Sequence, residues 1–187
     1  YSTNPELTPN QDVSGNYTFA VPSSTAYTAT FTPSAQGATT IDVAADTFTD
    51  ASGNNNTAAT QFNWTYDSVV PTMTIASGTV SSGATSNDGT IALTFTAGDT
   101  TADFVVGDIT VTNGTLSNFA GSGTDYTATF TPSNQGATTI AVAADTFTDD
   151  GGNNNTVSNT FAWTYDSVAP TMTIASGTVS SGATSND

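Results

Sequence analysis

The sequence contains a long internal repeat with an offset of 99 residues. Residues 26–88 and 125–187 align without a gap and differ at 11 of 63 positions. Periods of roughly 20 to 50 residues are typical of solenoids, whereas a period of this length corresponds to a whole domain. The chain is therefore expected to be a tandem array of domains. Its first 25 residues match the second copy poorly, which indicates a divergent or incomplete first unit.

Within one period, apolar residues alternate with small or hydroxyl residues, the pattern of strands that bury one face. The clearest run is Ile91, Leu93 and Phe95. Seven strands are predicted within 72–76, 90–96, 106–114, 114–123, 125–131, 138–144 and 159–166. Seven strands in about 99 residues, separated by turn signals, predict an all-β fold, an antiparallel β-sandwich.

Differences between the two copies indicate which residues of the last strand face the core. Gln61 and Asn63 are replaced by Thr and Ala one period later, whereas Phe62, Trp64 and Tyr66 recur. The recurring side chains are therefore expected to face the core. Their equivalents in the second copy are Phe161, Trp163 and Tyr165.

The chain has 16 acidic residues and no Lys, Arg, His or Cys. This composition excludes disulfides, metal sites built on His or Cys, and nucleophiles activated by His or Lys. Nucleic acid is excluded as a partner because a net charge of −16 repels phosphate. Paired carboxylates could serve a glycosidase, but no basic residue is present to tune their pKa, and we expect no enzyme. No apolar stretch reaches about 18 residues, so no membrane span is expected.

Three segments of the sequence are TYDSVAPTMTI (164–174), DITVTNGTLSNFAGSGTDYTATFTP (108–132) and DTFTDDGGNNNT (145–156). They resemble the immunoglobulin-like repeats of large bacterial surface proteins and repetitive adhesins. The resemblance implies tandem immunoglobulin-like β-sandwiches at the cell surface or outside the cell. It also implies boundaries at the YDS segment: an incomplete domain over 1–66, a complete one over 67–169, and the first strand of a following repeat over 170–187.

Oxygen-bearing side chains gather in an Asn-rich loop that occurs once in each copy. Carboxylate, amide and backbone oxygens suit Ca²⁺ better than a softer metal, although the spacing is not that of an EF-hand. The alternative is a turn whose side chains cap their own backbone. The candidate loop ligands are Asp46, Asp50, Asn54 and Asn56 in the first copy and Asp145, Asp149, Asn153 and Asn155 in the second.

A second candidate metal site is the domain junction, where Asp67 and Asp166 follow the last strand of each unit. Asp88 and Asp187 lie in the first loop between strands, and Asp99, Asp103 and Asp108 follow further along the chain. In arrays of the kind that the chain resembles, acidic junction residues can hold Ca²⁺ that stiffens the linker. Solvated surface carboxylates are the alternative interpretation.

The sequence favours a structural spacer that extends a surface protein or fibre, with neighbouring repeats or identical chains as partners and any glycan or surface target elsewhere in the protein. One alternative is a subunit of a filament in which chains are joined by β-strand donation. The segment 171–187 would then be the donated strand. Another is a Ca²⁺-dependent glycan-binding module that uses the loop Asp and Asn residues.

Overall fold

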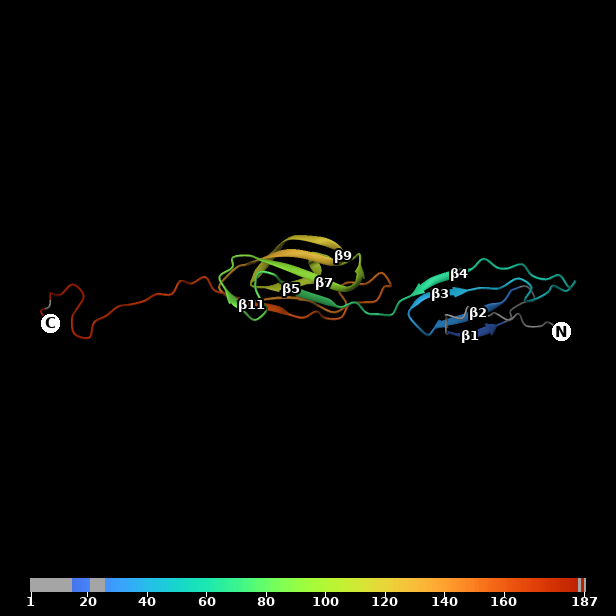
Figure 1. Ribbon diagram of the computed structural model, residues 1–187, viewed down its shortest axis with the longest axis horizontal. Helices are drawn as coiled ribbons and strands as arrows, with labels where there is room; N and C mark the ends of the chain where they lie inside the picture. Colours follow the sequence, from blue (N-terminus) through green and yellow to red (C-terminus); the bar gives the residue numbers. More distant parts are fainter. Residues whose placement is uncertain (1–14, 21–25, 185, 187) are drawn as a thin grey trace.

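The computed structural model describes residues 15–20, 26–184 and 186, and its regular structure is almost entirely β. A smaller N-terminal unit and a central domain lie end to end along the long axis of the molecule (Figure 1). A single turn of 3-10 helix, η1 (Val106–Asp108), precedes one strand of the central domain. None of the helices in the described residues is long and apolar enough to cross a membrane.

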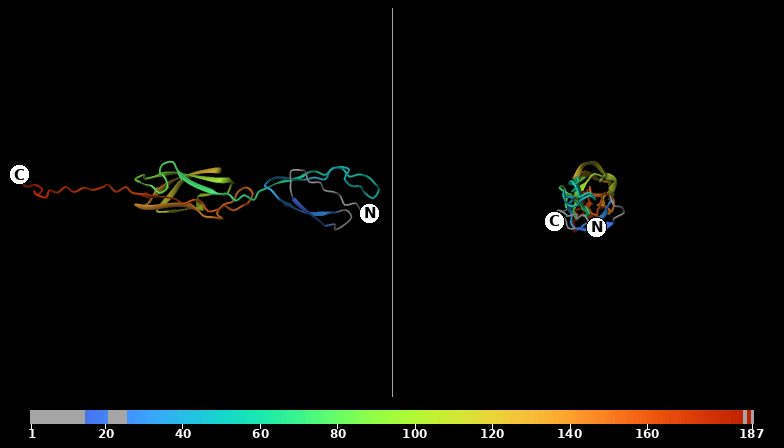
Figure 2. Two further views of the ribbon diagram at one scale, coloured as in Figure 1. Left: turned by 60° about the horizontal axis from the view of Figure 1, so that its bottom comes forward. Right: turned by 90° about the vertical axis from the view of Figure 1, so that its right-hand side faces the viewer.

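The central domain is a sandwich of two sheets (Figure 2). One sheet has the order β6 (Thr85–Ser86), β11 (Phe161–Tyr165), β10 (Gly136–Val142) and β8 (Ile109–Thr112). The other has the order β5 (Met73–Ser77), β7 (Ile91–Thr101) and β9 (Gly114–Pro132). All pairings are antiparallel except that of β6 with β11. The predicted all-β sandwich is confirmed.

The core lies between these sheets and is built from the alternating residues of their strands. In β7, Ile91, Leu93 and Phe95 are buried while the residues between them are exposed. Phe161 and Trp163 of β11 face them from the opposite sheet, each only 2% exposed. Period-two burial on both inner faces is what closes an antiparallel sandwich.

The long strand β9 turns back on itself. Gly121 and Gly123 have φ angles of +140° and +67°, which glycine adopts without strain. The two halves lie side by side, because a Cβ added to Gly121 would meet the Asp125 carbonyl oxygen and the Tyr126 Cα. This element therefore contains both the fourth and the fifth predicted strands, joined through a tight glycine turn.

The N-terminal unit repeats part of this architecture. Strands β1 (Gly15–Ala20) and β2 (Thr28–Pro33) form one pair, and β3 (Gly37–Ile41) and β4 (Phe62–Tyr66) form another. The register of β3 with β4 is that of β10 with β11, one period earlier. The surroundings differ, however: in the N-terminal unit Phe62 is 63% exposed.

The segment after β11 is exposed in its described residues, 166–184 and 186, except for the half-buried Val179, and none of them lies in a strand. Met172 and Ile174 are 89% and 92% exposed, whereas their equivalents Met73 and Ile75 in β5 are 3% exposed. The predicted first strand of a following repeat is thus unpaired here. A strand like β5 forms by pairing with the equivalent of β7 and burying its apolar face against that repeat.

Candidate functional site

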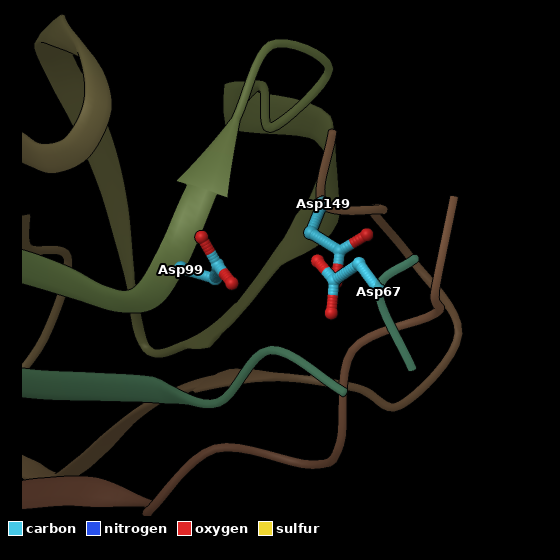
Figure 3. A group of neighbouring side chains, drawn as sticks. All are labelled: Asp67, Asp99 and Asp149. Carbon is cyan, nitrogen blue, oxygen red and sulfur yellow. The ribbon is translucent and has the colours of Figure 1, made fainter. Parts of the chain in front are cut away.

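Three carboxylates meet where the chain enters the central domain from β4 (Figure 3). Each of Asp67, Asp99 and Asp149 offers an oxygen, and these oxygens all lie within 4.8 Å of one another. Asp67 lies in the connection from β4 to β5, Asp99 in the last part of β7, and Asp149 in the loop between β10 and β11. Asp149 is buried and the other two are half-buried. We refer to these three residues as the acidic cluster.

A tight turn holds Asp149 in the cluster. Its Oδ1 accepts a hydrogen bond of 2.8 Å from the backbone N–H of Asn153, and the Asn153 side-chain amide donates to both carboxylate oxygens. Burial raises the pKa of Asp149, but hydrogen bonds from Asn153 and from the backbone of Gly151 and Gly152 outweigh it. The net effect is a pKa below the ordinary 3.8. Asp149 is therefore ionised at neutral pH.

The chain segment that carries Asp67 packs directly on this turn. The Asn153 side chain donates to the Asp67 carbonyl oxygen at 3.4 Å, and Asp67 Oδ1 accepts the Val69 backbone N–H at 3.0 Å. A Cβ added to Gly151 would lie 2.9 Å from the Asp67 Cβ. The first copy has Ser52 at the position of Gly151. Glycine at position 151 is thus what allows the incoming chain to approach so closely.

Asp99 reaches the cluster because the end of β7 is joined to the same incoming chain. The Gly98 backbone N–H donates to the Thr72 carbonyl oxygen at 2.8 Å. Asp99 Oδ1 accepts the Thr100 backbone N–H at 2.6 Å. Its Oδ2, like that of Asp67, accepts no hydrogen bond from the described residues. These two oxygens are therefore available to a ligand.

This donor set suits a hard divalent cation. Three carboxylates supply oxygen ligands, and backbone carbonyls or water complete the six to eight that Ca²⁺ takes. The chain has no Lys, Arg or His side chain that could neutralise the cluster instead. Since like charges at this separation repel one another, a bound divalent cation would lower the free energy of the folded state.

Two of the predicted loop ligands, Asn155 and Asn56, hydrogen-bond to the backbone of their own loops. Asn155 Oδ1 accepts the backbone N–H groups of Thr146 and Phe147, and its amide donates to the carbonyls of Ala143 and Thr156. Asn56 makes the equivalent four contacts in the first copy. This is the geometry of a side chain that caps its own turn.

The remaining candidates lie outside the acidic cluster. Asp145 and Asp46 adopt positive φ angles of 60° and 61° at the start of each loop. Hydrogen bonds from Asn54, chiefly from its side chain, hold the pKa of Asp50 below its ordinary value. Asp166 is exposed and accepts the Val168 N–H at 2.9 Å. The structure therefore joins one junction residue, Asp67, to one loop residue, Asp149, and adds Asp99, which neither sequence hypothesis had named as a ligand.

A fourth carboxylate, Asp103, ties the loop to the β7–β8 connection. Both of its oxygens accept the Thr148 backbone N–H, at 3.0 and 3.1 Å, and the hydroxyls of Thr148 and Thr101 donate to it at 2.8 Å. Desolvation raises the pKa of Asp103, but the hydrogen bonds from Thr148 and Thr101 outweigh it and leave the pKa below 3.8. Burial and the charge of Asp103 raise the pKa of Tyr126, whose hydroxyl donates to the Thr101 carbonyl.

Acid should weaken this tie. Because the folded-state pKa of Asp103 lies below its unfolded value, the stabilisation is present above about pH 4 and is lost as pH falls through the folded pKa. We expect the Tm to fall as the pH drops below about 4, and to fall less steeply in Asp103→Asn. Thermal melts followed by circular dichroism across this range measure both slopes. Asp125→Asn, which changes an exposed carboxylate of β9, is the control, and equal slopes in the two variants would contradict the role of Asp103.

Comparison with known proteins identifies the fold family. A family model described as the bacterial Ig-like domain matches residues 67–165, just over half of the chain. No curated protein and no solved structure matches it. Domains of this family are structural modules, typically of surface or extracellular proteins, and are not known as enzymes. The chain therefore belongs to the bacterial Ig-like domain family.

Proposed function

We propose that the chain is a mechanical spacer of an extracellular surface protein and that Ca²⁺ bound by the acidic cluster stiffens its junctions. The observation that carries the proposal is the path of the chain through the central domain. The chain enters at the end of the sandwich that faces the N-terminal unit and leaves at the opposite end (Figure 1). Copies joined in this way add length along one axis, which is what a spacer requires.

The way in which tension would reach the core supports the same conclusion. The incoming chain continues into β5 and the outgoing chain leaves from β11, and these strands belong to different sheets. Tension applied at the two ends would therefore load the packed interface between the sheets in shear. Since that interface holds the buried aromatic residues Phe95, Phe130 and Trp163, many contacts must break together before the domain extends.

The acidic cluster lies where an ion would have the largest mechanical effect. Asp67 belongs to the incoming chain, whereas Asp99 and Asp149 belong to the body of the central domain. A cation shared by the three would join the linker to the domain by ionic contacts. The chain has no basic side chain with which to form an equivalent salt bridge.

Calcium should raise the melting temperature of the chain and EDTA should lower it. An ion that binds only the folded state stabilises it by about 2.7 kcal/mol at 100 times its Kd. For a domain of about 100 residues this corresponds to a shift of roughly 10 °C or more. Asp99→Asn should abolish most of the shift, and Asp125→Asn, which removes a charge outside the cluster, should keep it. Melts in CaCl₂ and in EDTA, with calorimetric titration, measure both effects.

Pulling the chain from its two ends in a single-molecule force experiment tests the spacer itself. We expect a discrete unfolding event for the central domain, at a higher force in Ca²⁺ than in EDTA. If Ca²⁺ changes neither Tm nor force, the metal part of the proposal is wrong and the spacer part stands. If the domain extends without a resolvable event, the spacer part is wrong.

A further inference from the structure

The junction between the N-terminal unit and the central domain is held by hydrogen bonds from both sides. Asp67 and Ser68 follow β4 directly and precede β5. The Ser68 backbone N–H donates to Gln36 Oε1 at 3.0 Å, and Gln36 lies in the turn between β2 and β3 of the N-terminal unit. The Asp67 carbonyl oxygen accepts from Asn153 of the central domain. Each of two adjacent residues is thus bound by a different unit.

The order of these contacts along the chain is interleaved. Tyr66 is paired with Gly37 in the N-terminal unit, and Asp67 is bound by the central domain. Ser68 is bound by the N-terminal unit again. Beyond it, the carbonyl of Pro71 accepts from Thr156, and that of Thr72 from Gly98, both in the central domain.

Interleaving matters because of how a linker bends. The Asp67 carbonyl and the Ser68 N–H belong to one planar peptide group, with no rotatable bond between them. Rotation about the backbone bonds of the Asp67 Cα would move the N-terminal unit and break the Gln36 contact, and rotation about those of the Ser68 Cα would move the central domain and break the Asn153 contact. The Asx turn from Val69 N–H to Asp67 Oδ1 restrains the next residue as well.

We propose that the Gln36–Ser68 and Asp67–Asn153 contacts form a rigid joint between successive repeats, one that holds without a bound ion. The upstream half of the joint recurs one period later, at the exit of the central domain. There the Ser167 N–H donates to Gln135 Oε1 at 3.0 Å, and the Gln135 amide donates to the Ser167 hydroxyl at 2.6 Å. In an array with a following repeat, the partner of that half-joint would be the asparagine equivalent to Asn153. The rigid joint follows from these hydrogen bonds alone. Only its biological role, keeping the array straight, rests on the proposed spacer function.

The chain lends itself to a direct test because it contains no cysteine. Spin labels on Thr30→Cys in β2 and Thr110→Cys in β8, both at exposed positions, report the distance between the two units by pulsed electron paramagnetic resonance. All samples contain EDTA, so that a cation cannot contribute. We expect a narrow distance distribution for the parent, and a width about twofold larger in Gln36→Ala and in Asn153→Ala, because either change frees the linker.

Each variant has a matched control one period away. Gln135→Ala removes the equivalent glutamine at the far end of the central domain, and Asn54→Ala removes the asparagine equivalent to Asn153 from the loop of the N-terminal unit. Both should leave the width unchanged.

The proposal is overturned if the parent distance distribution is as broad as that of the Gln36→Ala and Asn153→Ala variants, or if the two control variants broaden it equally. Melts of every variant show that both units remain folded, and Gln36→Ala, at an exposed turn, carries the test if Asn153→Ala does not fold. A failed joint would leave the Ca²⁺-dependent melting and the unfolding force of the central domain unaffected, so the two proposals are separable.

Discussion

Phe161→Ala should destabilise the central domain by about 3–5 kcal/mol, the usual cost of truncating a buried phenylalanine. Phe161 is 2% exposed and belongs to the core between the two sheets. The loss combines the transfer free energy of the ring with the cavity left in a packed interior. Because domains of this size are stable by only about 5–15 kcal/mol, the variant should melt far below the parent.

The sequence supplies a control at the equivalent position of the first copy. Phe62→Ala makes the same chemical change in the corresponding strand, β4, but Phe62 is 63% exposed. We expect it to cost less than about 1 kcal/mol, as at other exposed positions. Urea unfolding of both variants followed by tryptophan fluorescence measures the difference. Equal effects would mean that the central sandwich is not packed as described.

This pair of residues also marks what the sequence could and could not predict about the fold. The recurrence of Phe62, Trp64 and Tyr66 beside changing neighbours predicted which face of the last strand is apolar. In the central domain the prediction is confirmed for Phe161 and Trp163. The same sequence pattern could not reveal that Phe62 is exposed. Burial depends on whether an opposing sheet covers the face, and that is a property of the whole unit rather than of the strand.

The acidic cluster was predictable only in part, for a related reason. The residue types and the junction position of Asp67 pointed to a hard cation, and the loop position of Asp149 pointed to the same chemistry separately. Nothing in the spacing indicated that the two converge. Asp99 joins them because the β7–β9 pairing shifts register between Thr96 and Thr101 and the end of β7 bonds to the incoming chain at Thr72. Register shifts of this kind arise from tertiary packing and leave little trace in a single sequence.

In the Asn-rich loop, the sequence singled out the asparagines but left two roles open, metal ligand or cap of the loop's own backbone. Amide oxygens are common ligands of Ca²⁺, but an amide also carries donors, which a carboxylate lacks. Asn155 uses both kinds of group on its own loop, with two hydrogen bonds received from the backbone and two donated to it. Asparagine is needed at this position because neither Asp nor Ala can supply both.

Asn155→Ala should therefore cost about 3 kcal/mol, since it leaves the buried N–H of Phe147 and three part-buried backbone groups without their partners. Asn155 is 2% exposed, so water cannot replace these contacts without opening the loop. The same loop carries Asp149, and its displacement should also weaken Ca²⁺ binding at the acidic cluster. The free energy of unfolding in urea measures the first effect, and calorimetric titration with CaCl₂ the second.

Two further variants identify the cause of the loss. Asn155→Asp keeps the oxygen that accepts from Thr146 and Phe147 but removes the donors to Ala143 and Thr156. Its free energy of unfolding should therefore lie between those of the parent and Asn155→Ala. Asn56→Ala removes the same four contacts from the less buried loop of the N-terminal unit and should leave the central domain and its Ca²⁺ affinity unchanged. If Asn155→Ala lowers Ca²⁺ affinity without lowering stability, Asn155 acts as a ligand rather than as a cap, and the loop hypothesis for the metal replaces the acidic cluster.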